Sequence, residues 1–353
     1  MSVDPALASA VAVGLPGAPV VSTAAGPGTV TGAVEHRVQG LLWRAIAAGR
    51  VSADHSVRSA ARDAHLAALR TSLMAEETAV LACTALDADG VDSRVLKGIA
   101  ISHLDHDDPA ERVFGDADVL VRRADHGRAL AALTGAGFVR SEPPVRSWWE
   151  RRFGKAIVMQ APNGGELDLH LSLTGGYYGE ALDMIGLMDH PGDRTELAGR
   201  SVRTLDRHDR LLQACCHSVL GGASGLRAQR DIAQLVLITG ADWQLAAERA
   251  GEANVVVATA LARAWQTLAL DDHPANVWAG GFRASERQRR ALATYQAAFT
   301  STWAPEGRGI LAALSPIDRV RFAIGVAFPS QASLRSRDRT VGQHLRQIVS
   351  SIR

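Results

Sequence analysis

Two aspartates, Asp116 and Asp118, lie one residue apart in the stretch RVFGDADVLV, residues 112–121. They stand at the head of an apolar run, 119–121, that predicts a buried strand. Because alternate side chains of a strand share a face, both carboxylates are expected to project together at the edge of the core. A solvated acidic turn would account for such a pair, and so would a divalent metal site.

A third carboxylate follows in the stretch GELDLHLSL, where Glu166, Asp168 and His170 alternate with leucines. The alternation predicts a strand with these three side chains on one polar face and the leucines toward the core. The turn PNGG (162–165) predicts a hairpin with the preceding apolar run. Carboxylates on neighbouring strands of a small sheet can hold two Mg²⁺ ions against a nucleoside triphosphate, so Asp168 joins the aspartate pair as the candidate metal set.

The lysines of the chain are few. Of its 38 basic residues only two, Lys97 and Lys155, are lysines, and the rest are arginines. In a chain that uses arginine wherever either residue serves, a remaining lysine is expected to be needed for its compact point charge. The alternative is that both lysines survive by chance.

These residues must be positioned by a mixture of helices and strands. A helical pattern runs over about 38–86, and the run RVLKGIAIS (94–102) predicts a strand that turns into a helix. The strand with the aspartate pair, a helix over about 124–133 and the hairpin follow, and the chain beyond GGYYGE reads as successive helices. We expect an α+β fold with a small mixed sheet. Its expected parts are a flexible leader (1–35), N-terminal helices (36–90), a compact β-rich core (91–175), a helical C-terminal domain (176–330) and a polar C-terminal helix or tail (331–353).

The composition limits the function classes. With 47% apolar residues, 21% charged residues and a formal net charge of +1, the chain has the profile of a soluble globular protein. Nucleic-acid binders usually carry a clear basic excess, so the neutral balance counts against that class of partner. The three cysteines form no metal-binding spacing and are expected as reduced thiols of a cytoplasmic protein. No apolar run reaches about 18 residues, so no membrane span is expected.

The segments VLKGIAIS, ERVFGDADVLV and ELDLHLSL together resemble the bacterial uncharacterised nucleotidyltransferase family of the DNA polymerase β-type superfamily. The likeness covers roughly residues 38–240, and a later helical segment with His217, Arg230 and Asp231 shares it less specifically. The chain departs from the wider superfamily in having Lys97-Gly98 where a Gly-Gly or Gly-Ser pair is usual. The number of residues between Gly98 and the aspartate pair is also larger than is usual in the superfamily.

The resemblance implies a Mg²⁺-dependent nucleotidyltransferase that moves an NMP group from ATP or another NTP to an acceptor and releases pyrophosphate. Its acceptor would be a hydroxyl-bearing small molecule, peptide or protein. The core over 91–175 would then be catalytic, with two ions bound by the three aspartates and Asp168 as general base. The implied nucleotide-binding residues are Lys97, Gly98, Arg112 and Lys155, and His170 would lie on the acceptor side.

Other interpretations stay open at this point. A toxin-like enzyme that modifies tRNA has similar motifs, and so has a non-catalytic nucleotide-binding regulatory protein. Arg112 could instead form a surface salt bridge with Glu111 or Asp108, and His170 could be a hydrogen-bonded structural residue. His217, beside two cysteines on an apolar helix, is expected as a core residue.

Overall fold

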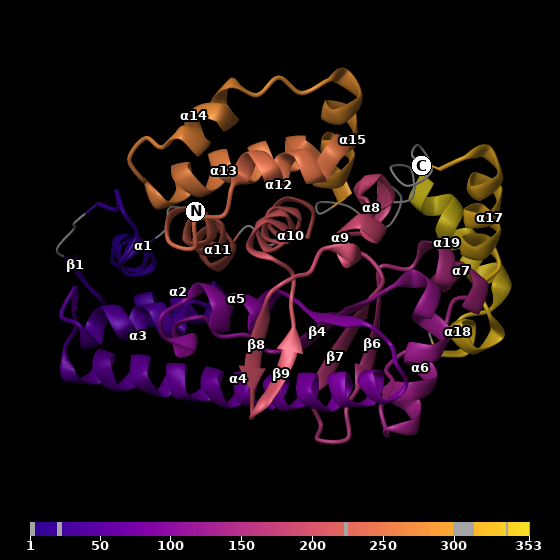
Figure 1. Ribbon diagram of the computed structural model, residues 1–353, viewed down its shortest axis with the longest axis horizontal. Helices are drawn as coiled ribbons and strands as arrows, with labels where there is room; N and C mark the ends of the chain where they lie inside the picture. The colour runs from indigo at the N-terminus through magenta and orange to yellow at the C-terminus, as the bar shows by residue number, and fades with distance from the viewer. Residues whose placement is uncertain (1–3, 20–22, 222–224, 299–313, 337, 353) are drawn as a thin grey trace.

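The computed structural model describes residues 4–19, 23–221, 225–298, 314–336 and 338–352 (Figure 1). A mixed five-stranded sheet lies at its centre in the order β3–β4–β7–β6–β5. The strands β4 and β7 are parallel, and every other neighbouring pair in this sheet is antiparallel. The α+β prediction with a small mixed sheet is therefore confirmed. The strand bounds are β3 Ser93–Val95, β4 Ala117–Val121, β5 Val139–Arg140, β6 Ala156–Gln160 and β7 Glu166–His170.

The hairpin predicted from the turn PNGG joins β6 to β7. Asn163 accepts a hydrogen bond from the Gly165 backbone through its Oδ1 (3.0 Å), and Gly164 takes a φ of +85°, which suits glycine. Five residue pairs lie in register between the two strands. The turn thereby fixes which side of the sheet each residue of β7 faces.

One face of the sheet is covered by α4 (His55–Ala88), a helix of 34 residues that runs beneath the sheet in Figure 1. Asp54 begins the helix by accepting a hydrogen bond from the Val57 backbone (2.8 Å). Alanines and Leu86 of α4 share a buried cluster with Val119 of β4 and Leu167 of β7. Ala117, Val119 and Val121 of β4 belong to this cluster, as do Leu167 and Leu169 of β7. The alternate residues, among them Asp118 and Asp168, therefore face the other side of the sheet.

The opposite face of the sheet lies under a helical layer (Figure 1). Leu120 of β4 shares a second buried cluster with residues of this layer, among them Ile232 and Trp265. The layer and the helix that follows β3 have these bounds: α5 Lys97–Asp105, α10 Arg207–Leu220, α11 Leu226–Leu237, α12 Trp243–Ala250, α13 Asn254–Leu268 and α14 Pro274–Gly281. The face that carries Asp118 and Asp168 is thus enclosed between the sheet and these helices.

The N-terminal segment corrects one expectation. Its described residues form α1 (Pro5–Ala12) and α2 (Pro27–Glu35), so they are not a flexible leader. Both helices have proline in the first turn, where its missing N–H is harmless. The side chain of Arg230 on α11 donates to the backbone carbonyls of Val11 (2.6 Å) and Val13 (2.8 Å) at the end of α1. With α3 (Gln39–Ala47) and Val51 of the short strand β2 (Val51–Ser52), these helices form a third buried cluster. The strand β2 pairs in parallel with β1 (Thr23–Ala24).

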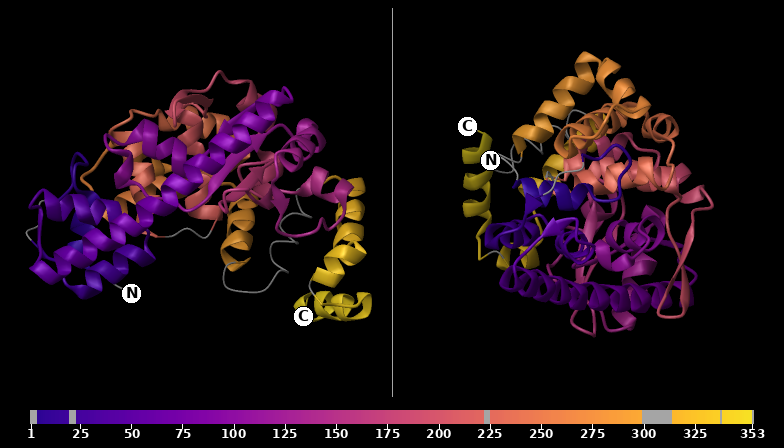
Figure 2. Two further views of the ribbon diagram at one scale, coloured as in Figure 1. Left: turned by 90° about the horizontal axis from the view of Figure 1, so that it is seen from below. Right: turned by 90° about the vertical axis from the view of Figure 1, so that its left-hand side faces the viewer.

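The C-terminal helices pack at the other end of the molecule, as the left view of Figure 2 shows. The ring of Trp149 on α7 lies 5.3 Å from that of Phe322 on α17, and its indole N–H donates to the Phe322 carbonyl (3.2 Å). The remaining elements are η1 Pro109–Glu111, η2 Arg123–Asp125, α6 His126–Gly135, α7 Ser147–Phe153, α8 Gly176–Ala181, α9 Met184–Asp189, β8 Arg194–Leu197, β9 Arg200–Arg203, η3 Gly251–Ala253, α15 Glu286–Ala298, α17 Pro316–Ala327, α18 Gln331–Ser336 and α19 Val341–Ile352.

Candidate functional site

The parallel pairing of β4 and β7 brings two of the predicted carboxylates together. Asp118 and Asp168 are direct partners in the register, and neighbouring partners of a parallel pair point to the same side of the sheet. His170 follows on the same face of β7, and its Nε2 donates to Asp118 Oδ1 over 2.7 Å. Among the described residues, possible ligand atoms of Asp118, Asp168 and His170 all lie within 4.8 Å of one another.

Lys97 completes this group from the start of α5. Its ammonium forms an ion pair with Asp118 and lies 3.2 Å from His170 Nε2. The Lys97 backbone has a φ of +41°, a region that favours glycine, and its N–H donates to Oε1 of Gln213 on α10 (3.1 Å). A left-handed conformation at a residue with a Cβ costs about 1–2 kcal/mol, so the fold holds Lys97 here against a local preference.

The pKa values of Asp118 and Asp168 are shifted in opposite directions. Burial alone would raise the pKa of Asp118, but the His170 hydrogen bond and the Lys97 charge outweigh it and hold that pKa well below its ordinary value. Burial, followed by the negative charge of Asp118, raises the pKa of Asp168. Asp168 is also the more accessible group, with 23% of its side chain exposed against 3% for Asp118.

The donor set fits a magnesium ion. Mg²⁺ takes few protein carboxylates and fills its other positions with water and phosphate oxygens, which matches a paired Asp118 and Asp168 on one face. His170 contacts Asp118 and so orients that carboxylate. Asp116 lies just before β4, half-buried and outside the close group of possible ligands. Its role as a metal ligand therefore stays a prediction.

The sequence suggested that Arg112 binds the nucleotide or forms a surface salt bridge, but in the structure it forms a buried ion pair with Asp231. Its Nε and Nη2 donate to the two carboxylate oxygens of Asp231 on α11 (3.0 and 2.7 Å), and both side chains are buried. The alternative of a surface salt bridge with Glu111 or Asp108 is wrong, because Arg112 is buried against Asp231 and Glu111 pairs with Arg44. The Arg112 Nη1 is buried without a hydrogen-bond partner among the described atoms. This one nitrogen could still donate to a phosphate.

Gly98 packs so closely against Phe114 that there is no room for a larger residue, which the sequence alone did not indicate. A Cβ added at this residue would lie 2.6 Å from Cβ of Phe114 and 3.0 Å from Nη1 of Arg112. The first turn of α5 is thus pressed against the segment that leads to β4. Glycine is required there by contact within the protein, whether or not a phosphate also approaches.

Lys155, the second lysine, precedes β6 and is exposed along its side chain. Desolvation by the neighbouring protein, together with repulsion from Lys97, nevertheless lowers the pKa of Lys155. The charges of Asp118 and Asp168 act on it in the opposite direction. Lys155 therefore lies in the electrostatic field of the carboxylates without an ion pair to them.

The helical layer adds residues that we did not select from the sequence. Gln213 holds the Lys97 backbone, and its Nε2 is buried without a hydrogen-bond partner among the described atoms. Arg227 lies one helical turn before Asp231 on α11, and burial and the charge of Arg112 lower its pKa to about 10. His217 is also in this layer, where burial and the charge of Lys97 lower its pKa to about 3. Only the four-residue spacing of Arg227 and Asp231 could have indicated their common face.

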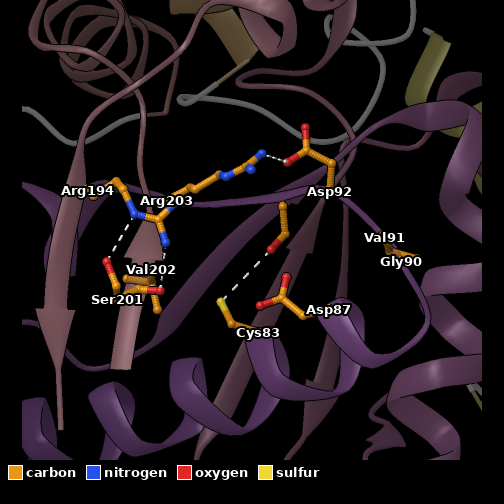
Figure 3. A pocket seen from close by; sticks show the side chains of 10 residues that line it. Cys83, Asp87, Gly90, Val91, Asp92, Arg194, Ser201, Val202 and Arg203 are labelled. Carbon is orange, nitrogen blue, oxygen red and sulfur yellow. Dashed lines mark hydrogen bonds and ion pairs between the residues drawn. The ribbon is translucent and has the colours of Figure 1, made fainter. Parts of the chain in front are cut away.

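Two other groups of polar side chains among the described residues are held by ion pairs or hydrogen bonds. His190, Asp206 and Asp209 form a second compact group, but Arg249 binds both of its carboxylates (2.7 and 3.0 Å). A cavity of about 430 Å³ lies between α4 and the β8–β9 hairpin (Figure 3). In it Arg194 donates to Ser201 and Arg203 binds Asp92 (2.9 Å). This cavity is on the α4 side of the sheet, away from Asp118.

Comparison with known proteins adds one finding. A family model described as "Uncharacterised nucleotidyltransferase" matches residues 29–267, roughly two thirds of the chain. The match runs from α2 to the end of α13 and includes all strands of the central sheet. No curated protein matches the chain. Among the described residues, we find no helix with the length and apolar character needed to cross a membrane.

Proposed function

Because the chain belongs to the uncharacterised nucleotidyltransferase family, we propose that it transfers a nucleoside monophosphate from an NTP to a hydroxyl-bearing acceptor. In this reaction the acceptor oxygen bonds to the α-phosphorus, and the bond from that phosphorus to the oxygen of the β-phosphate breaks. Pyrophosphate leaves, and the acceptor loses its hydroxyl proton. We propose the same acceptor classes as before, a small molecule, a peptide or a protein.

The observation that carries the proposal is the side-by-side register of Asp118 and Asp168 on one face of the sheet. We assign Asp116, Asp118 and Asp168 as ligands of Mg²⁺, with Asp116 entering from the residue before β4. When bound, the ion would neutralise phosphate charge and orient the triphosphate for in-line attack. Asp168, the more exposed carboxylate, is assigned as the acceptor of the hydroxyl proton.

The cationic groups around the carboxylates support binding of a triphosphate. Lys97 forms an ion pair with Asp118, and Lys155 lies in the electrostatic field of Asp118 and Asp168, so both supply positive charge near the carboxylates. Arg227 has no carboxylate within ion-pair distance among the described residues, and the buried Nη1 of Arg112 lacks a hydrogen-bond acceptor. An anionic ligand in this region would satisfy donors that the protein leaves unpaired. His170 is assigned to orient Asp118, and its contact with the acceptor stays a prediction.

The test uses each of the four NTPs labelled at the α- or the γ-phosphate, with Mg²⁺ and a panel of hydroxyl acceptors that includes tRNA. We expect α-label to move to an acceptor and γ-label to leave as pyrophosphate. The variants Asp118→Asn and Asp168→Asn should lose transfer by at least a hundredfold. Glu166→Gln is the matched control, because Glu166 is an exposed carboxylate on the same strand and outside the close group.

Three other outcomes of this test would favour different functions or contradict the assigned site. Transfer to tRNA alone would support the toxin-like alternative. Binding of Mg²⁺-NTP without any transfer would support a non-catalytic nucleotide-binding regulatory protein. Transfer that survives Asp118→Asn would contradict the assignment of the site.

A further inference from the structure

The ammonium of Lys97 contacts the carboxylate oxygen Oδ1 of Asp118, which is one of the possible metal-binding atoms of the site. It pairs with Asp118 Oδ1, the same oxygen that accepts from His170, and it lies 3.2 Å from the imidazole nitrogen. We infer that Lys97 is a resident counter-cation that keeps a divalent ion from Asp118 until the triphosphate of an incoming nucleotide takes the lysine away. This inference rests on the proposed function and adds an order of binding to it.

The geometry leaves little room for both cations. The distance between Mg²⁺ and a carboxylate oxygen that binds it is about 2.0–2.1 Å. Asp118 is buried and Oδ1 already contacts two nitrogen atoms, so an ion at that distance from Oδ1 would meet the ammonium directly. Like charges this close repel strongly in a poorly solvated site. Either the lysine leaves the carboxylate or the ion binds weakly.

The backbone of Lys97 allows the side chain to leave without disturbing α5. Its N–H is held by Gln213, and the helix begins at this residue. The four-carbon stem of lysine has enough rotatable bonds to swing the ammonium toward solvent, and 15% of the side chain is already exposed. The exchange therefore needs a change of side-chain rotamer and no movement of an element.

A departing lysine needs another anion, and the nearby protein offers a poor supply. Asp231 is already bound by Arg112, and Asp168 is the register partner of Asp118, so a lysine that moved to Asp168 would still lie at the same site. A triphosphate brings several negative charges at once and pairs well with an ammonium. Binding of polyphosphate and binding of metal should thus favour each other, and by linkage each raises the affinity of the other by the same factor.

The first measurement is the affinity of the whole protein for Mn²⁺ without nucleotide, read by the electron paramagnetic resonance of free Mn²⁺. We expect Lys97→Met to bind Mn²⁺ at least tenfold more tightly than the wild type. Lys155→Met is the matched control, because it removes the same charge near the carboxylates without vacating Asp118, and it should change the affinity less than threefold. Adding Asp118→Asn to Lys97→Met should abolish the gain.

A second measurement follows polyphosphate. Inorganic tripolyphosphate, without metal, should bind at least tenfold more weakly to Lys97→Met than to the wild type. Lys97→Gln, which keeps a polar group beside Asp118, serves as a second variant with the same expectations, and far-UV circular dichroism checks that both variants are folded. Equal or weaker Mn²⁺ binding in the folded Lys97 variants would overturn the inference. Nucleotidyl transfer is measured separately, so loss of the proposed function gives a different result from loss of this coupling.

Discussion

The buried pair of Arg112 and Asp231 provides the sharpest test of how the helical layer is joined to the segment before β4. The two residues are 119 positions apart, and their bidentate contact joins α11 to the segment that leads to Asp116. In Asp231→Leu the guanidinium of Arg112 would stay buried without its partner, beside the positive charge of Arg227. Breaking a buried pair from one side costs about 3–5 kcal/mol, a large part of the 5–15 kcal/mol typical of a folded protein.

The assay is urea denaturation followed by tryptophan fluorescence and circular dichroism. Asp231→Leu should lower the free energy of unfolding by about 3–5 kcal/mol, and the double variant with Arg112→Met should regain most of that loss, since apolar replacements leave no buried charge. Asp189→Asn is the control: Asp189 binds Arg122 at 2.7 Å but is 60% exposed, so this change should cost about 1 kcal/mol or less. A loss below about 1 kcal/mol in Asp231→Leu, or no recovery in the double variant, would refute the reasoning.

Two further predictions concern packing and pH. Gly98→Ala should lower the free energy of unfolding by about 1–3 kcal/mol in thermal denaturation, because the added methyl group would meet Phe114. Gly127→Ala is the control: this glycine lies in α6 with open space around it, so the change should stabilise the protein slightly. Equal effects of the two changes would contradict the close contact at Gly98. The pKa of His217 in the folded protein is lowered to about 3, so between pH 3 and about 6.5 the unfolded chain binds a proton that the folded protein does not. The free energy of unfolding should therefore decrease as the pH is lowered through that window. His217→Gln should remove up to about 2 kcal/mol of the wild-type loss between pH 7 and 5, measured by urea denaturation at both values, and an unchanged loss would count against this cause.

The sequence could predict those parts of the site that follow from short-range periodicity. The alternation in β7 placed Asp168 and His170 on one face, and the Asn-Gly turn indicated the hairpin that fixes it. Both signals act over a few residues, so no knowledge of the remaining chain is needed. The metal roles assigned to the aspartates remain predictions.

Contacts between distant segments were beyond such reasoning. The partner of Arg112 lies on α11, and nothing near Arg112 in the sequence selects Asp231 over other acidic residues. The N-terminal segment was misjudged for a related reason. Its prolines and glycines suggested interrupted structure, yet Pro5 and Pro27 stand in the first turns of helices that gain their stability by packing on distant elements.

The scarcity of lysine has a practical consequence for chemical labelling. An amine-directed reagent finds only two lysine side chains in this chain, and both lie beside the same pair of carboxylates. Lys155 is exposed and its lowered pKa favours the reactive neutral amine, whereas the Lys97 ammonium is held by Asp118. The chain thus carries two built-in reporter positions of unequal reactivity, and the extent of acylation at each would record which anion its nitrogen contacts.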